Sequence, residues 1–305
     1  MEILTTIVPL CIVIAVGWAA RWRGAITELF LEPANRLVYY LAIPAMVFRA
    51  VAGASLAEQL RGGVLAVSLV AVLILFGMAW AVAGRFSMAD RSAGTFIQSA
   101  FHGNLGYIGL AVAYYFLGDD GFVQASLLAG FLMIIQNILA VVILTVRGRP
   151  VVGDISGALL KIGGNPVIVS AFLGIAFSMA HWPVPVVIDR ALAILGGMAL
   201  PLALLIIGAS ISPALIRGRM GAAAASSLMK LVVLPGIGFG LYRLLGGSPA
   251  TFLPALILLA SPSATIVYVM AREMDGDAEL AVATISCSTL LSAGTFMVWL
   301  SIARG

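Results

Sequence analysis

Two polar clusters interrupt otherwise apolar stretches of this chain. Residues 101–118 read FHGNLGYIGLAVAYYFLG, and residues 261–265 read SPSAT. Neither cluster pairs a nucleophile with a base or has the spacing of a metal site. The first offers the Asn104 amide, the second offers hydroxyl groups, and both offer backbone N–H donors, which suit the binding of an anion. The chemistry predicted from these residues is therefore recognition of a negatively charged solute without a covalent step.

Glycine and proline in these clusters predict broken helices. Gly103, Gly106 and Gly109 each lower helical stability by up to ~1 kcal/mol relative to alanine, and Pro262 removes a backbone donor. Irregular backbone at membrane depth persists only when buried in protein or lining a water-filled cavity. The alternative is that the small residues only permit close helix packing. The predicted substrate-binding residues here are Asn104, Gly106, Tyr107, Ser261, Pro262, Ser263 and Thr265.

Lys230 is the one basic residue predicted at mid-membrane depth. It lies about ten residues into an apolar stretch, or roughly 15 Å at helical rise. A buried ammonium is costly and usually functional, so Lys230 is a candidate to steady the broken helices beside an anionic substrate. The alternative is that its side chain snorkels to the interface along Gly221–Ser227.

Three further residues are candidates for coupling or for lining the same cavity. His102 could titrate near neutral pH and contribute to coupling, although a single histidine is often structural. Gln136 and Asn137 could line the cavity, and interhelical hydrogen bonding is an equal alternative.

Several function classes are excluded or disfavoured. All thirteen acidic residues fall in predicted loops or at span ends, so no carboxylate relay for sodium or protons is expected. The chain has no H-E-x-x-H or G-x-S-x-G motif, which argues against an enzyme. Cys11 and Cys287 form no C-x-x-C motif, and no Lys/Arg run suggests nucleic-acid binding. We expect no cofactor and no metal.

The elements that must position these residues are membrane helices. The 305 residues are 62% hydrophobic and only 10% charged, against about a quarter charged in soluble domains. Charged and Gly/Pro-rich breaks divide the chain into about ten apolar segments of spanning length. The class predicted is an all-α polytopic membrane protein, with spans at 3–21, 35–53, 62–84, 92–117, 121–146, 165–181, 185–210, 220–245, 250–271 and 277–302.

Basic residues predict the orientation. Eleven Lys and Arg follow odd-numbered spans and five lie on the opposite side, which places the odd loops in the cytoplasm and both termini outside. One of the five, Arg49, is expected to snorkel outward. The connection 147–164 is then a cytoplasmic linker, in which Asp154–Lys161 could form an interfacial helix. The first span, with no basic residues before it, is expected to be retained in the inner (plasma) membrane.

An internal repeat relates the two halves, 1–146 and 165–305. A shift of 157 residues places Pro9 on Pro166, and LAIPA (41–45) on MALPL (198–202). It also places Asn104 on Ser261. Because five spans are an odd number, the second copy has inverted topology, as in many secondary transporters.

At these residues the chain resembles the auxin efflux carrier family, whose bacterial members include carriers for malate and malonate. The resemblance covers nearly the whole chain. Its motifs are LVYYLAIPAMVFRAV (37–51), HGNLGYIGLA (102–111), ALPLALLIIGASIS (199–212) and SPSATIVYVMARE (261–273).

The resemblance implies ten spans in two inverted halves, with broken helices 4 and 9 crossing at mid-membrane. Helices 1, 2, 6 and 7 would form a scaffold that dimerises through helices 2 and 7, and helices 3–5 and 8–10 a moving core. Asn104 matches the asparagine that contacts the substrate carboxylate, and Pro262 a proline that starts the second crossover. Ala111 and Val267 stand at the positions where plant members of the family carry crossing prolines, so Gly106 and Gly109 would carry a softer break.

The function expected is secondary transport of small organic anions by elevator-type alternating access without sodium. A sodium- or proton-coupled symporter on a fold like that of the bile-acid symporters is the alternative, and a channel-like or sensory role is a further one.

Overall fold

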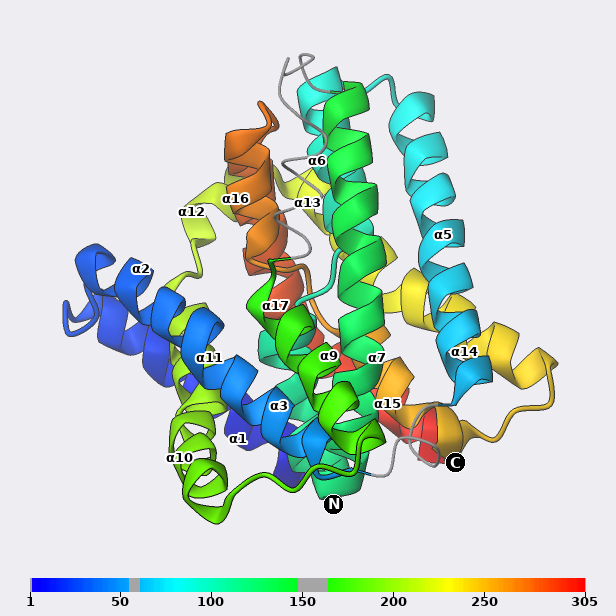
Figure 1. Cartoon of the computed structure of the whole chain (residues 1–305). Coiled ribbons are helices and arrows are strands. Elements are labelled where there is room, and N and C mark those ends of the chain that lie inside the picture. The colour runs from blue at the N-terminus through cyan, green and yellow to red at the C-terminus, as the bar shows by residue number, and fades with distance from the viewer. Residues whose placement is uncertain (1, 55–60, 148–163, 305) are drawn as a thin grey trace. The chain divides into compact units, whose positions relative to one another are not determined.

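The computed structural model describes residues 2–54, 61–147 and 164–304, and every element named within them is a helix (Figure 1). Extended backbone pairs in one isolated bridge, between Gly103 and Ser263. The all-α prediction is therefore confirmed for the described residues. Residues 148–163, which hold most of the predicted linker and the possible helix Asp154–Lys161, lie outside them.

Part of the predicted set of spans is visible as helices of membrane-crossing length. Within the described ranges, six helices are long and apolar enough to cross a membrane: Ile3–Trp22, Gly62–Arg85, Leu105–Arg147, Val186–Ala209, Met220–Leu244 and Ala278–Arg304. Two shorter apolar helices cover Pro166–Met179 and Pro249–Ala260. The arrangement of ten spans as inverted repeats remains a prediction.

The chain divides into two compact units. The first comprises residues 1–62, 106–131 and 163–210. Its described helices are α1 (Glu2–Trp22), α2 (Glu28–Leu37), η1 (Val38–Ala42), α3 (Ile43–Ala52), α9 (Pro166–Met179), α10 (Val186–Gly197), α11 (Ala199–Ala209) and the early part of α7 (Leu110–Arg147). The π-helix η2 (Leu105–Gly109) leads into α7.

Close contact between α1 and α11 organises the first unit. A Cβ atom added to Gly208 would lie 1.9 Å from the carbonyl oxygen of Ile14, so only glycine fits there. Gly17 faces Leu205 in the same way. In a membrane the hydrophobic effect does not drive helices together. Association depends on close packing, which small residues allow.

Two features of the first unit differ from the sequence-based expectation. The helix containing the predicted second span begins at Glu28, not at residue 35, because Thr27 caps it by accepting a hydrogen bond from the Phe30 N–H. The side chain of Arg49, expected to snorkel outward, instead forms an ion pair with Asp189 of α10 at 2.7 Å. A bidentate carboxylate partner fixes the guanidinium.

The second unit comprises residues 63–105, 132–162 and 211–305. It contains the late part of α7 and a set of helices centred on α17, which packs against α6, α13, α15 and α16. Its elements are α5 (Gly62–Arg85), α6 (Asp90–Phe101), α12 (Pro213–Gly218), α13 (Met220–Leu228), η3 (Met229–Val233), α14 (Leu234–Leu244), α15 (Pro249–Ala260), α16 (Ile266–Glu273) and α17 (Ala278–Arg304).

Each of two π-helical turns is followed, two residues after its end, by a proline. η1 is followed by Pro44 and η3 by Pro235, each at the second residue of the next helix. A proline ring clashes with the carbonyl four residues earlier, and that carbonyl belongs to the third residue of each turn, Tyr40 or Leu231. The wider π-turn relieves the clash. Such turns are often found at functional sites.

Candidate functional site

The second unit contains two helix breaks that lie against each other. α6 ends at Phe101 and α15 ends at Ala260, and extended backbone follows each. The Asn104 N–H donates to the Pro262 carbonyl at 2.7 Å, and the Ala264 N–H donates to the His102 carbonyl at 2.9 Å. The predicted polar clusters are thus joined by backbone hydrogen bonds.

The break in the fourth predicted span is centred on Gly103. The expectation that Gly106 and Gly109 carry it is wrong, because both lie within η2. A Cβ atom at Gly103 would lie 2.8 Å from Ser261 Oγ and 3.0 Å from Lys230 Cε. The close-packing alternative therefore has support at this residue, since a side chain there would have to displace Ser261 or Lys230.

The carboxyl ends of α6 and α15 are capped by side chains. The Ser263 hydroxyl donates to the Ser99 carbonyl at 2.8 Å, and the Ser261 hydroxyl donates to the Leu258 carbonyl at 2.6 Å. The last carbonyls of a helix have no partner within it and form its negative dipole end. Ser261 and Ser263 therefore satisfy these carbonyls and stabilise the break.

Lys230 caps the same end of α15 with a positive charge. Its Nζ atom donates to the Leu259 carbonyl at 2.6 Å, and the residue is 0% exposed. Snorkelling along Gly221–Ser227 is thereby contradicted. No carboxylate pairs with Lys230 in the part of the chain that the structure describes.

The amino end of α16 has no side-chain cap. Thr265 precedes the helix but makes no capping hydrogen bond with its hydroxyl. The Val267 and Tyr268 N–H groups donate to carbonyls three residues earlier, those of Ala264 and Thr265, at 3.1 and 3.2 Å. This end retains the positive dipole that favours an anion.

Gln136 supports the break from α7, whereas Asn137 does not. Gln136 Oε1 accepts from the Gly103 N–H at 3.2 Å, and its Nε2 has no partner among the described residues. Asn137 Nδ2 donates to the Met133 carbonyl of its own helix at 2.8 Å. This bond lies within one helix, so it is not the interhelical hydrogen bond that was the alternative for Asn137.

His102 and Asn104 are both buried, 4% and 6% exposed. The backbone of each pairs with the opposite segment. His102 lies in the break itself, and its Nδ1 atom has no partner within the described ranges.

Gly106 and Tyr107 belong to the first unit. The Tyr107 hydroxyl donates to Asn35 Oδ1 of α2 at 2.6 Å. Asn35 was not singled out from the sequence, because nothing in its surroundings signals a partner 72 residues away.

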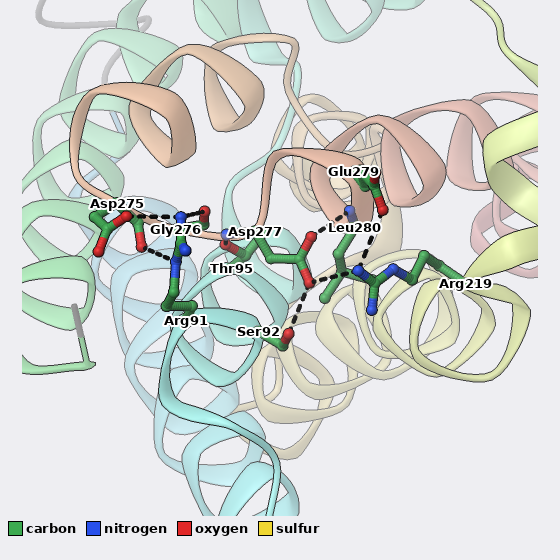
Figure 2. A network of polar contacts seen from close by, with 9 residues as sticks. All are labelled: Arg91, Ser92, Thr95, Arg219, Asp275, Gly276, Asp277, Glu279 and Leu280. Carbon is green, nitrogen blue, oxygen red and sulfur yellow. Dashed lines mark hydrogen bonds and ion pairs between the residues drawn. The ribbon is translucent and has the colours of Figure 1, made fainter. Parts of the chain in front are cut away.

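A second polar network, also missed from the sequence, joins α6 to the turn between α16 and α17 (Figure 2). Asp277 Oδ1 accepts from the Leu280 N–H at 3.0 Å, which caps α17, and Oδ2 accepts from the Ser92 hydroxyl at 2.7 Å. The Asp277 N–H donates to Thr95 Oγ1 at 2.8 Å, and Arg219 lies 3.6 Å from the carboxylate. An aspartate before an apolar helix was the available signal.

Arg91 strengthens this connection. Its guanidinium donates to the Asp275 carbonyl at 2.9 Å and forms an ion pair with the Asp275 carboxylate at 2.6 Å. The network holds the start of α6 to the end of α16. The two interrupted spans are thus joined at two places, at the network and at the paired breaks.

Comparison with known proteins identifies relatives along the whole chain. A family profile described as "Membrane transport protein" matches residues 2–156 and 154–300. A Rhizobium meliloti protein named "Putative malonate transporter" is 27% identical over 268 residues, covering 86% of this chain and 83% of the relative. Uncharacterized transporters of Methanothermobacter thermautotrophicus and Methanocaldococcus jannaschii are each 23% identical, covering 96% and 94% of both chains respectively.

Proposed function

Because this chain belongs to the membrane transport protein family, the auxin efflux carrier family that its motifs resemble, we propose that it is a secondary transporter of small organic anions. The proposed substrates are carboxylates. The relatives are transporters and not enzymes, and the one with a named substrate is named for malonate. Malonate is therefore the first probe to use.

The observation that carries the proposal is the buried ammonium of Lys230. It holds the carboxyl end of α15 through the Leu259 carbonyl and has no carboxylate partner among the described residues. A buried charge without a counter-ion is unfavourable, so an anion arriving nearby is stabilised. The amino end of α16, which has no side-chain cap, also favours a negatively charged ligand.

The proposed mechanism is elevator-type alternating access in the inner membrane. A core of predicted spans 3–5 and 8–10 would carry the anion past a scaffold of spans 1, 2, 6 and 7, which would dimerise through spans 2 and 7. Both termini would lie outside. An inside-negative potential supplies about 2.3 kcal/mol per charge per 100 mV for export without sodium.

Transport of labelled malonate into proteoliposomes tests the proposal. Saturable counterflow that is unchanged by a sodium gradient is the expected result. Stimulation by a sodium or proton gradient would favour the coupled symporter instead. Non-saturable flux would point to a channel, and absence of flux for a panel of mono- and dicarboxylates would reject an organic-anion carrier.

A thermal-shift assay on purified protein locates the site. A ligand that binds only folded protein raises its apparent stability. We expect malonate to raise the melting temperature of the wild type and of Asn137→Ala, whose amide bonds its own helix. Asn104→Ala is expected to lose the shift. An unchanged shift in Asn104→Ala would remove Asn104 from the site.

A further inference from the structure

Trp299 of α17 supplies a hydrogen bond that Pro235 removes. In an α-helix the Leu231 carbonyl would accept from the N–H of residue 235, but proline has none. The indole Nε1–H of Trp299 donates to this carbonyl at 2.9 Å. The donor comes from a helix 68 residues away in sequence, in the same unit.

The indole is held at this place by packing on α14. Its ring centroid lies 6.4 Å from that of Phe239, in an edge-on arrangement. The indole also lies close to Gly236. A Cβ atom added at this glycine would lie 3.4 Å from Trp299 Cη2, at ordinary van der Waals distance. The hydrogen bond is therefore formed by a side chain with little freedom to turn away.

The accepting residue is adjacent to Lys230 in the π-turn η3. Lys230 Nζ contacts the Leu259 carbonyl of α15, and Leu231 O contacts Trp299 of α17. If one residue left η3 and the turn relaxed to a regular α-helix, the side chains at its start, Lys230 included, would rotate by about 100° relative to those after it. Lys230 would then point away from the paired breaks.

We propose that Trp299 is a positioning residue for transport, which holds η3 in the π-helical form that directs Lys230 to the end of α15. This inference rests on the proposed function for the role of Lys230. It assigns Trp299 no contact with the transported anion.

The test is a double-mutant comparison in proteoliposomes with labelled malonate. Trp299→Phe keeps an aromatic ring and removes the N–H, and we expect it to lower counterflow about fivefold, the factor that a net hydrogen bond of about 1 kcal/mol represents. Pro235→Ala gives residue 235 its own N–H, which can satisfy the Leu231 carbonyl, and it removes the ring clash that the π-turn relieves, so this variant is itself expected to lower counterflow. In the Pro235→Ala background we expect Trp299→Phe to change counterflow less than about twofold.

Trp182→Phe is the matched control, since this indole is 61% exposed. Wild-type transport by Trp299→Phe would overturn the proposal. An equal loss with and without Pro235→Ala would also overturn it, because packing alone would then explain the effect. If Trp299→Phe does not fold, folding of the double variant supports the proposal, and failure of both variants contradicts it.

Lys230→Met separates this inference from the proposed function. Loss of transport in Lys230→Met with normal transport in Trp299→Phe would reject the positioning role alone. Normal transport in Lys230→Met would reject the proposed role of Lys230 and, with it, the positioning role. The thermal midpoints of the four Trp299 and Pro235 combinations would still report whether the hydrogen bond couples these two residues.

Discussion

Lys230 and Leu259 are joined by a hydrogen bond of 2.6 Å between an ammonium and the carbonyl at the end of a broken helix. The pair is fully buried. It places a positive charge at the negative end of the α15 dipole, where each stabilises the other. The positive dipole end at the start of α16 has no side-chain cap.

Replacement of Lys230 by methionine should reduce both stability and transport. The Leu259 carbonyl would lose a buried donor, which costs about 1–3 kcal/mol, and the anion would lose a neighbouring charge. We expect a lower thermal midpoint and at least a tenfold loss of malonate counterflow. Lys230→Arg keeps the charge but is larger, so its midpoint should also fall. A Lys230→Met variant with wild-type transport would show that the charge has no role there.

Replacement of Gly103 by alanine should destabilise the paired breaks. The added Cβ would lie 2.8 Å from Ser261 Oγ and 3.0 Å from Lys230 Cε, and overpacking of this kind typically costs about 1–3 kcal/mol. Gly84→Ala in α5 is the control, because its Cβ would meet nothing within 4 Å and alanine favours a helix. Unfolding in detergent should show opposite shifts of the midpoint. Equal shifts would mean that the close approach at Gly103 is not maintained.

Replacement of Asp277 by alanine should loosen the connection between α6 and the α16–α17 turn. The change removes a helix cap, which costs about 0.5–2 kcal/mol, together with the hydrogen bond from Ser92. Glu279→Ala is the control, since this side chain is 65% exposed and joins only the rim of the network. Hydrogen exchange of the first turn of α17 should quicken in Asp277→Ala and stay unchanged in Glu279→Ala. Unchanged exchange in both variants would count against Asp277 as the central residue.

Replacement of Tyr107 by phenylalanine removes a hydroxyl but no charge, and it should lower stability. Asn35 Oδ1 would lose the donor that lies 2.6 Å away, at a cost of about 1–3 kcal/mol if no other group replaces it. Tyr107→Phe paired with Asn35→Ala should cost less than the sum of the single changes. Strict additivity of the two changes in the thermal midpoint would show that the hydrogen bond contributes nothing.

The sequence located the two broken regions better than it located the breaks within them. Clusters of glycine, serine and proline weaken a helix wherever they occur, so HGNLG and SPSAT were recognisable from composition. The break itself falls at Gly103, because that is where the backbone pairs with Ser263. The competing assignment to Gly106 and Gly109 failed since glycine within a π-turn can remain helical.

Ion pairs and caps were the least predictable features. Arg49, Asp277 and Asn35 were each read from local context, as snorkelling, loop or unremarkable residues. Their partners, Asp189, Ser92 and Tyr107, lie between 72 and 185 residues away. A side chain's choice between water, lipid and a distant partner depends on distances that local periodicity does not contain.

The sequence by itself determined that this is a membrane protein and that it is built of helices. A chain so apolar must satisfy its backbone internally, and in a single chain of this pattern that requires helices. Only the tertiary structure decided which backbone carbonyl each donor outside the regular helical pattern contacts. Lys230 donates to the Leu259 carbonyl, the Trp299 indole to the Leu231 carbonyl, and the Asn104 N–H to the Pro262 carbonyl. Every residue carries the same carbonyl and nearly every residue the same N–H, so residue type does not mark these partners, and only the folded chain selects them.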